Sequence, residues 1–365
     1  MTDTTVSARA RAKQWDDGFF REYVRSNIYK RYMGGNENSI IQVNNDLTKK
    51  KGDAVTFNLV GAIDASAGPN TGNTQLVGNE KAVPNDGWRV NIGVVRDAVR
   101  TNLLEEQASA FDLREAAKVQ LKELAQRYLR NDINTALGSI NGIAYGTATP
   151  TQRNNWNAAN VDRVLYGNAV ANYNATHATA LAAVTSSMKL DTATVSLAKR
   201  LARNAKTANG EGIRPVRFDE DEEFFVMFVG TKAFRDLRLD MVTNKYWQEA
   251  LERAKSNPLF TSTGSILWDN VLVREIPSIA DIGTVGASSA NVAPYYLCGA
   301  QAIGVSWAQT TKTTIAKEDD YGFKNGVGFF EMRGIGKIQY NPSDGAATAK
   351  DWGVLTGFVG AAADA

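Results

Sequence analysis

The residues that could do chemistry are few. The sequence has one histidine, His177, and one cysteine, Cys298. A zinc site with two histidines and a disulfide within the chain are therefore excluded. A nucleophilic scheme with a histidine base would have to use His177, which lies in a polar stretch with no serine or cysteine in a nucleophile-elbow pattern. We predict that His177 is a surface or loop residue and that Cys298, among apolar neighbours, is a small buried residue.

Two further patterns could hold an ion. The acidic run 219–223 offers oxygen ligands, but it lacks the alternating ligands and the glycine of a calcium loop, so we interpret it as a solvated turn or a charged contact between copies. Gly334-x-Gly336-Lys337 is similar to part of a phosphate loop, but Glu331 stands where the first glycine is needed. We interpret these glycines as tight turns and bulges. The sequence predicts no catalytic residue, no cofactor and no metal ion.

The composition is that of a globular protein with almost balanced charge. Apolar residues make up 43% and charged residues 22%, and the net charge is +2. A protein that grips DNA by neutralising many phosphates usually has a clear basic excess, whereas a protein that only encloses DNA does not need one. The polar start of the sequence predicts no signal peptide, and the longest strongly apolar run, Phe224 to Val229, is too short for a membrane span.

The first predicted element is an amphipathic helix over 8–32. Trp15, Phe19 and Tyr23 are spaced by four residues and place an apolar stripe along one side. Such a stripe must be covered, either by the core of the same chain or by a neighbouring copy, and the sequence leaves both alternatives open.

A long hairpin is predicted next. A basic turn, Lys49, Lys50 and Lys51, precedes a strand with period-two alternation over 55–59, and a second strand is expected from Trp88 to Val95. Residues 61–82 between them are rich in glycine and asparagine. Because isolated two-stranded ribbons are only marginally stable, we expect a neighbouring copy to support this hairpin.

The remaining elements predict an α+β fold. A helix beginning at Asp112 and ending before Gly138 would be about 40 Å long. A second helix is expected from Asp191 or Thr192 to Ala205. A compact α+β unit with a buried strand at 224–229 should follow Pro215, and two long strands should lie within 313–340.

This order of elements resembles the major capsid proteins of tailed bacteriophages, in a podovirus-like branch. The stretch from Ser39 to Phe57 resembles the start of their extended loop. Four shorter phrases also resemble this family: Arg163-Val-Leu-Tyr-Gly167, Phe225-Val-Met-Phe-Val229, Asn257-Pro-Leu-Phe260 and Val292-Ala-Pro-Tyr-Tyr-Leu-Cys-Gly-Ala-Gln301. The resemblance covers nearly the whole chain and implies the Hong Kong 97-type capsid fold.

The resemblance implies a division of the chain into named parts. These are an N-terminal arm (1–45), an E-loop hairpin (46–100), a P-domain with the long spine helix (101–215), an A-domain (216–310), the returning strands of the P-domain (311–345) and a C-terminal tail (346–365). It also implies a virion protein that is assembled in the host cytoplasm into pentamers and hexamers around double-stranded DNA, without sequence-specific binding and without a membrane.

The expected partners are further copies of the chain, a separate scaffolding protein, a portal and a decoration protein. Seven residues are predicted to contact other copies: Trp15, Phe19, Tyr23, Lys49, Lys50, Lys51 and Trp88. Three other functions remain as alternatives. One is the shell of an encapsulin-like cellular nanocompartment, the second is an enzyme with a carboxylate site at 219–223, and the third is another virion protein, such as a tail or decoration subunit.

Overall fold

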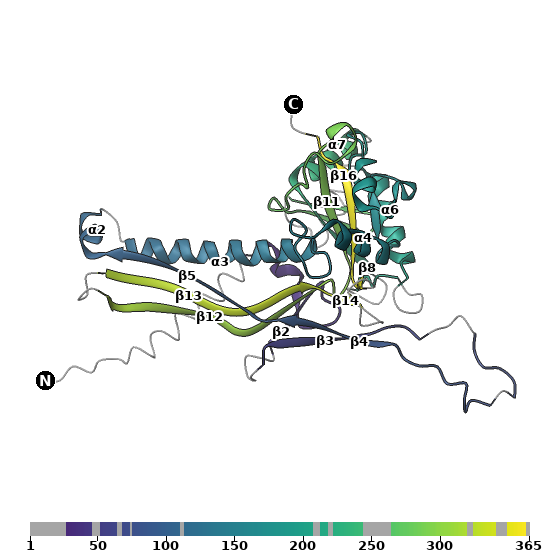
Figure 1. Cartoon of the computed structure of the whole chain (residues 1–365), viewed down its shortest axis with the longest axis horizontal. Helices are drawn as coiled ribbons and strands as arrows, with labels where there is room; N and C mark the ends of the chain where they lie inside the picture. The colour runs from purple at the N-terminus through teal and green to yellow at the C-terminus, as the bar shows by residue number, and fades with distance from the viewer. Residues whose placement is uncertain are drawn as a thin grey trace.

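Figure 1 shows the computed structural model of the chain, an elongated layer with a compact unit at one end. The structure describes residues 27–45, 52–63, 68–73, 75–109, 113–206, 212–217, 222–243, 264–319, 324–340 and 349–362. Helices and sheets occur in both parts, as the α+β prediction requires.

The elongated layer consists of a five-stranded sheet with one long helix along it. The helix α3 (Leu113–Leu137) has 25 residues and is therefore about 37 Å long. The sheet has the order β1-β2-β12-β13-β5. Its strands are β1 (Met33–Gly34), β2 (Ile41–Asn44), β5 (Gly93–Asn102), β12 (Ile303–Asp319) and β13 (Lys324–Lys337). The predicted long helix and the two long strands are thus confirmed, while Asp112 lies outside the described residues.

An apolar stripe and a buried ion cluster hold α3 on this sheet. Leu121, Leu129 and Ile133 lie on the side of α3 that faces the core. Arg333 of β13 is 2.5 Å from Asp132 of α3 and 3.0 Å from Glu331. Glu331 is fully buried and accepts a hydrogen bond from Thr311. Arg333 and Glu331 are buried and paired, as charges this deep must be, and the ion pair with the half-exposed Asp132 links the sheet to the helix.

The compact unit is built on a seven-stranded sheet. Its order is β6-β16-β11-β8-β10-β9, and β7 pairs with β8. The strands are β6 (Val164–Tyr166), β7 (Val216–Arg217), β8 (Glu223–Val229), β9 (Ser265–Trp268), β10 (Val271–Glu275), β11 (Val292–Cys298) and β16 (Val354–Gly360). The helices of this part are α4 (Pro150–Ala159), α5 (His177–Ala182), α6 (Thr192–Asn204) and α7 (Thr231–Thr243). As predicted, Asp191 caps α6 by accepting from the Thr194 amide.

Residues 346–365, predicted as a tail, contain one of the central strands of this sheet. Every residue of β16 is buried between β6 and β11 (the yellow strand in Figure 1). A Cβ at Gly357 would lie 2.0 Å from Cζ of Tyr295, so the small residue that looked typical of a tail is needed for close packing. Residues 101–215 likewise include β6 and α6, which pack with this sheet. The division into named domains stays a prediction.

The hairpin forms a separate two-stranded sheet. β3 (Ala54–Val60) pairs with β4 (Asn85–Asn91), with Phe57 opposite Trp88. The strand predicted from Trp88 to Val95 is divided, because β4 ends at Asn91 and β5 begins at Gly93 in the other sheet. The loop between β3 and β4 continues beyond the body of the molecule (Figure 1).

The short elements complete the described fold. They are the 3-10 helices η1 (Ile28–Tyr32), η3 (Val170–Asn172) and η6 (Ala287–Ser289), the helix α2 (Leu103–Ala108), and the paired strands β14 (Gln339–Tyr340) and β15 (Lys350–Asp351). The η1 segment anchors on α3, because the Tyr29 hydroxyl donates to Asn134.

Candidate assembly surfaces

Trp88 fastens the base of the hairpin to its own chain. Its ring lies 5.5 Å from that of Phe57. Below both rings, a Cβ at Gly304 would lie 2.6 Å from the Trp88 ring and one at Gly336 would lie 2.8 Å from it. Two neighbouring strands, β12 and β13, therefore have glycine where the indole lies. We call this contact the glycine seat; it orients the hairpin on the five-stranded sheet.

The glycine seat changes the interpretation of Gly334 and Gly336. Neither has a positive φ, so neither serves as a tight turn. A Cβ at Gly334 would lie 2.4 Å from the Asn91 carbonyl oxygen, so this residue also permits the close approach of β4. Lys337, the lysine of the phosphate-loop pattern, is buried and lies 2.7 Å from Asp351. These residues form a packing surface rather than an anion site.

Of the seven residues predicted to contact other copies, Trp88 alone lies among the described residues. It is partly buried by its own chain, and a contact with a second copy remains a prediction. Trp15, Phe19, Tyr23, Lys49, Lys50 and Lys51 lie outside the described residues, so the structure does not bring them together with Trp88.

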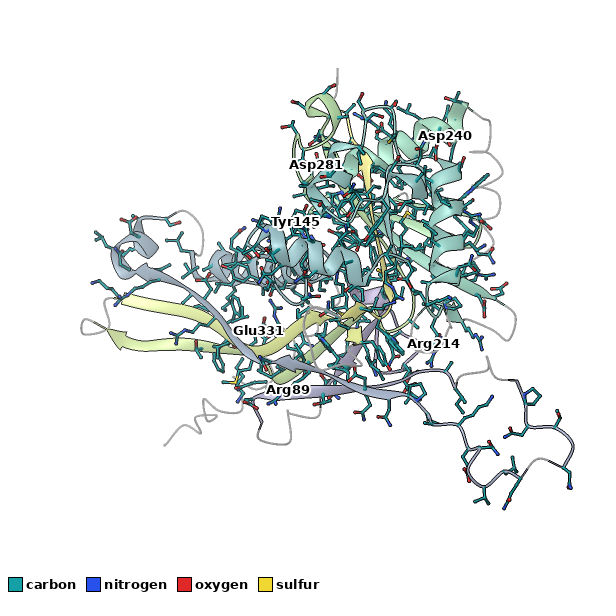
Figure 2. The ribbon with its side chains drawn as sticks, turned by 45° about the vertical axis from the view of Figure 1, so that its right-hand side comes forward. Arg89, Tyr145, Arg214, Asp240, Asp281 and Glu331 are labelled. Carbon is teal, nitrogen blue, oxygen red and sulfur yellow. The ribbon has the colours of Figure 1, made fainter. Side chains whose placement is uncertain are left out.

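The outer part of the hairpin carries apolar side chains that the sequence analysis missed. Leu76 is 66% and Val77 is 75% exposed, and Ile63 and Val83 are also exposed. Figure 2 shows the side chains of this loop standing clear of the rest of the molecule. The loop is rich in glycine and asparagine, so its composition alone did not indicate the adjacent aliphatic pair. Adjacent exposed aliphatic side chains are typical of an interaction surface.

Exposed aliphatic residues also lie on the elongated layer. Val94 and Val99 of β5, Leu104 of α2 and Val119 of α3 are exposed. β5 is an edge strand, and it carries Arg96, Asp97 and Arg100 along its length, as edge strands often carry charges. Exposed aliphatic side chains thus occur on two separate parts of the chain, one of them beside charged residues, which suits contacts between unlike patches.

His177 is buried and begins α5, so the prediction of a surface or loop position was wrong. Its Nδ1 lies 2.6 Å from the Tyr166 hydroxyl and its Nε2 lies 2.9 Å from the Tyr145 hydroxyl. The amide nitrogen of Asn157 donates to Asn174, so its oxygen is the atom that accepts from Tyr166. Tyr166 must then accept from Nδ1–H, and Nε2 accepts from Tyr145. Burial lowers the pKa of His177 to about 4.

The other chemical groups lie in structural settings. Cys298 is buried as predicted, and burial raises the pKa of its thiol. Asp351 accepts from Trp156, Gln339 and Lys337 in a closed network. Of the acidic run, residues 219–221 lie outside the described residues, and Glu223 pairs with Arg203 and Arg217.

Two properties of the described residues bear on function. Within the described ranges, no group of three or more His, Cys, Asp or Glu side chains could hold a metal ion. Among the helices of the same ranges, none combines the length and the apolar character needed to cross a membrane.

Comparisons with known proteins agree with this architecture. A family model described as phage capsid protein matches residues 3–362. The major capsid protein of Pseudomonas phage KPP25 is 26% identical over 376 residues, covering 95% of this chain and 94% of the relative. A chain of the cyanophage Pam1 capsid asymmetric unit is 33% identical, with a TM-score of 0.80 and full coverage of both chains.

A more distant structure shares the fold. A chain of the Ralstonia phage GP4 capsid is 21% identical, with a TM-score of 0.73, and the match covers 93% of this chain and 92% of that one. The spine helix on its sheet, the projecting hairpin and the compact unit are accordingly those of the Hong Kong 97-type capsid fold. The chain belongs to the phage capsid protein family.

Proposed function

We propose that the chain is a major capsid protein, a non-enzymatic subunit that assembles with its own copies into the icosahedral head of a tailed phage. The hairpin is the observation that carries this function. It projects beyond the body, its base contacts the five-stranded sheet through Trp88, and it exposes adjacent aliphatic side chains at its outer end. Exposed aliphatic side chains on a projecting hairpin do not stabilise an isolated subunit, whereas a shell subunit can use them for contact with a neighbour.

The shell is built from contacts between different patches. When one patch of a subunit meets another patch of the next, repetition closes a ring if the rotation per contact closes. In this proposal the rings are pentamers and hexamers. Each interface is modest in area, but every subunit makes several contacts at once, and the combined effect makes a closed shell far more stable than one contact.

Each named part has a proposed role in these contacts. The A-domain, residues 216–310, meets its copies around the ring axis. The E-loop hairpin lies over the P-domain of a neighbouring subunit. The N-terminal arm, with Trp15, Phe19 and Tyr23 on its apolar stripe, reaches an adjacent subunit.

The proposal also extends to other partners. A separate scaffolding protein guides closure, a portal occupies one vertex, and a decoration protein binds outside. The shell encloses double-stranded DNA without reading its sequence, which agrees with a net charge of only +2. A viral head is favoured over a cellular nanocompartment because the family model is that of phage capsid proteins.

Expression of the full chain, with and without a scaffolding protein from the same genome, tests this function. Analytical ultracentrifugation measures particle mass, and negative-stain electron microscopy shows particle shape. We expect closed shells or rings of megadalton mass. A chain that stays monomeric in the presence of the scaffold would overturn the proposal.

A further inference from the structure

We propose that the turn at the hairpin tip, Leu76-Val77, inserts into an apolar hollow on a second copy of the chain, lined by Met33, Ile40, Val216, Phe224, Val226 and Leu272. The inference rests on the proposed assembly function and names the two surfaces of one contact, in which the hairpin lies over the neighbour's P-domain and its tip reaches residues of the neighbour's N-terminal arm and A-domain. We call them the tip knob (residues 75–80) and the hollow.

The tip knob is held in shape by its own hydrogen bonds. The Asn79 amide donates to the Leu76 carbonyl at 2.9 Å, and its side-chain nitrogen donates to the Gln75 carbonyl at 2.8 Å. The Gly78 amide donates to the Glu80 carboxylate at 2.7 Å. The turn is therefore preorganised, although Leu76 and Val77 remain largely exposed to solvent among the residues that the structure describes. Preorganised apolar groups lose little conformational entropy when they bind.

The hollow matches the tip knob in size and polarity. It has a volume of about 210 Å³ and lies between the η1–β2 segment and strands β7, β8 and β10. A cavity of about 150 Å³ with aliphatic walls already holds a benzene-sized molecule, so this one has room for an aliphatic side chain. Arg31 and Arg217 line the same hollow, and Arg217 already pairs with Glu223, while the tip knob carries Glu80. The charge of Arg31 at the rim is therefore complementary to that of the knob.

The occupant comes from another copy, because the hairpin keeps its own tip away from its own hollow. Arg214 donates to the Val60 carbonyl at the root of the hairpin. Val216 and Arg217 of the hollow follow Arg214 closely in the chain (Figure 2 labels Arg214). Fifteen residues separate Val60 from Leu76, which corresponds to as much as about 50 Å of extended chain. The loop runs outward from its root (Figure 1), so the contact joins unlike patches of two copies.

Leu76→Asp tests the knob, with Gln75→Glu as its matched control. Both variants add a carboxylate to the tip, but only the first removes an aliphatic side chain. Under conditions in which the wild-type chain forms particles, we expect Leu76→Asp to lower particle yield at least about tenfold. We expect Gln75→Glu to assemble as the wild type does, and both unassembled subunits to melt at the wild-type temperature.

Two variants test the hollow. Asn36→Trp places a large side chain at an exposed position of the rim and should lower the yield as Leu76→Asp does. Chains with Val77→Cys, assembled together with chains that carry Asn36→Cys, should be joined by a short bis-maleimide in particles but not as free subunits. Native Cys298 is buried and does not interfere.

The outcomes separate this inference from the proposed function. Wild-type particles together with normal yields from Leu76→Asp or Asn36→Trp would overturn the knob-and-hollow contact and leave the capsid function intact. Loss of assembly in Leu76→Asp, with normal assembly of Asn36→Trp and no cross-link, would overturn the hollow as the receptor. Failure of the wild-type chain to assemble even with its scaffold would overturn the capsid function itself.

Discussion

The seven-stranded sheet and the β3–β4 hairpin are stabilised in opposite ways. Every residue of β11 and β16 is buried, so that sheet draws its stability from its own chain. In β3, buried and exposed side chains alternate, and beyond Val60 the described residues of the loop are mostly exposed. A region that buries its core can fold alone, whereas one that is covered on one side needs a support. The comparison indicates that the seven-stranded sheet stabilises the folded subunit and that the hairpin serves assembly.

The largest effect on subunit stability is expected in the seven-stranded sheet. Phe228 of β8 is fully buried, and its ring lies 5.2 Å from those of Tyr29 and Tyr32. Phe228→Ala should lower the free energy of unfolding by about 3–5 kcal/mol, because it leaves a cavity. Urea denaturation of the unassembled subunit measures this, with Val242→Ala on the exposed side of α7 as the control. A loss below about 1 kcal/mol would show that this sheet does not dominate stability.

The next largest effect is a dependence of subunit stability on pH, which arises from His177 in the compact unit. The folded-state pKa of His177 is about 4, against an ordinary value of 6.5. The unfolded chain therefore binds a proton more readily than the folded chain. The free energy of unfolding has its full value above pH 6.5 and decreases as the pH falls from 6.5 to 4. The loss approaches about 3 kcal/mol, because each pKa unit corresponds to about 1.4 kcal/mol.

Denaturation of the unassembled subunit at a series of pH values measures this loss. His177→Asn should flatten the stability profile between pH 6.5 and 4, even if the variant is less stable at every pH. A variant profile with the wild-type slope would assign the pH dependence to other groups.

A smaller and more local effect is expected at the glycine seat. Trp88→Ala should change the free energy of global unfolding by less than about 1 kcal/mol, because the hairpin can detach without opening either large sheet. Hydrogen exchange of the β3 and β4 amides should accelerate at least about tenfold. Arg89→Ala is the matched control, since its ion pair with Asp53 is exposed. Faster exchange in β11 or β16 as well would mean that the seat supports the whole fold.

The smallest effect on subunit stability should come from the outer loop. Removal of residues 61–82 takes away a segment whose described side chains are mostly exposed, so the unfolding midpoint should stay within the error of the wild type. Assembly should fail, as judged by electron microscopy. Normal particles from this deletion would show that the outer loop is not required for assembly, and would contradict the distinction between a folding region and an assembly region.

Local periodicity was sufficient to predict the long helix, the α6 cap, the buried strand β8, the two long strands and the existence of the hairpin. In these segments one face is buried or the whole segment is apolar, and the spacing of apolar residues along the chain indicates this directly. The phrases that resemble capsid proteins also lie within short stretches, and for this reason the family was predictable.

Positions that depend on distant residues were not predictable. His177 lies among polar neighbours in the chain, yet Tyr145 and Tyr166 enclose it. The segment 346–365 is rich in small residues and was predicted as a tail, although Val354–Gly360 within it form β16 between β6 and β11.

The sequence by itself determined the long helix α3, the buried strand β8, the two long strands β12 and β13, and the family, because those depend on the order of nearby side chains. Only the tertiary structure decided that Trp88 lies over Gly304 and Gly336, and that the tip knob and the hollow lie at separate places on one chain. The physical reason is that a contact depends on the distance between atoms in space, and residues more than two hundred positions apart leave no local pattern that reports it.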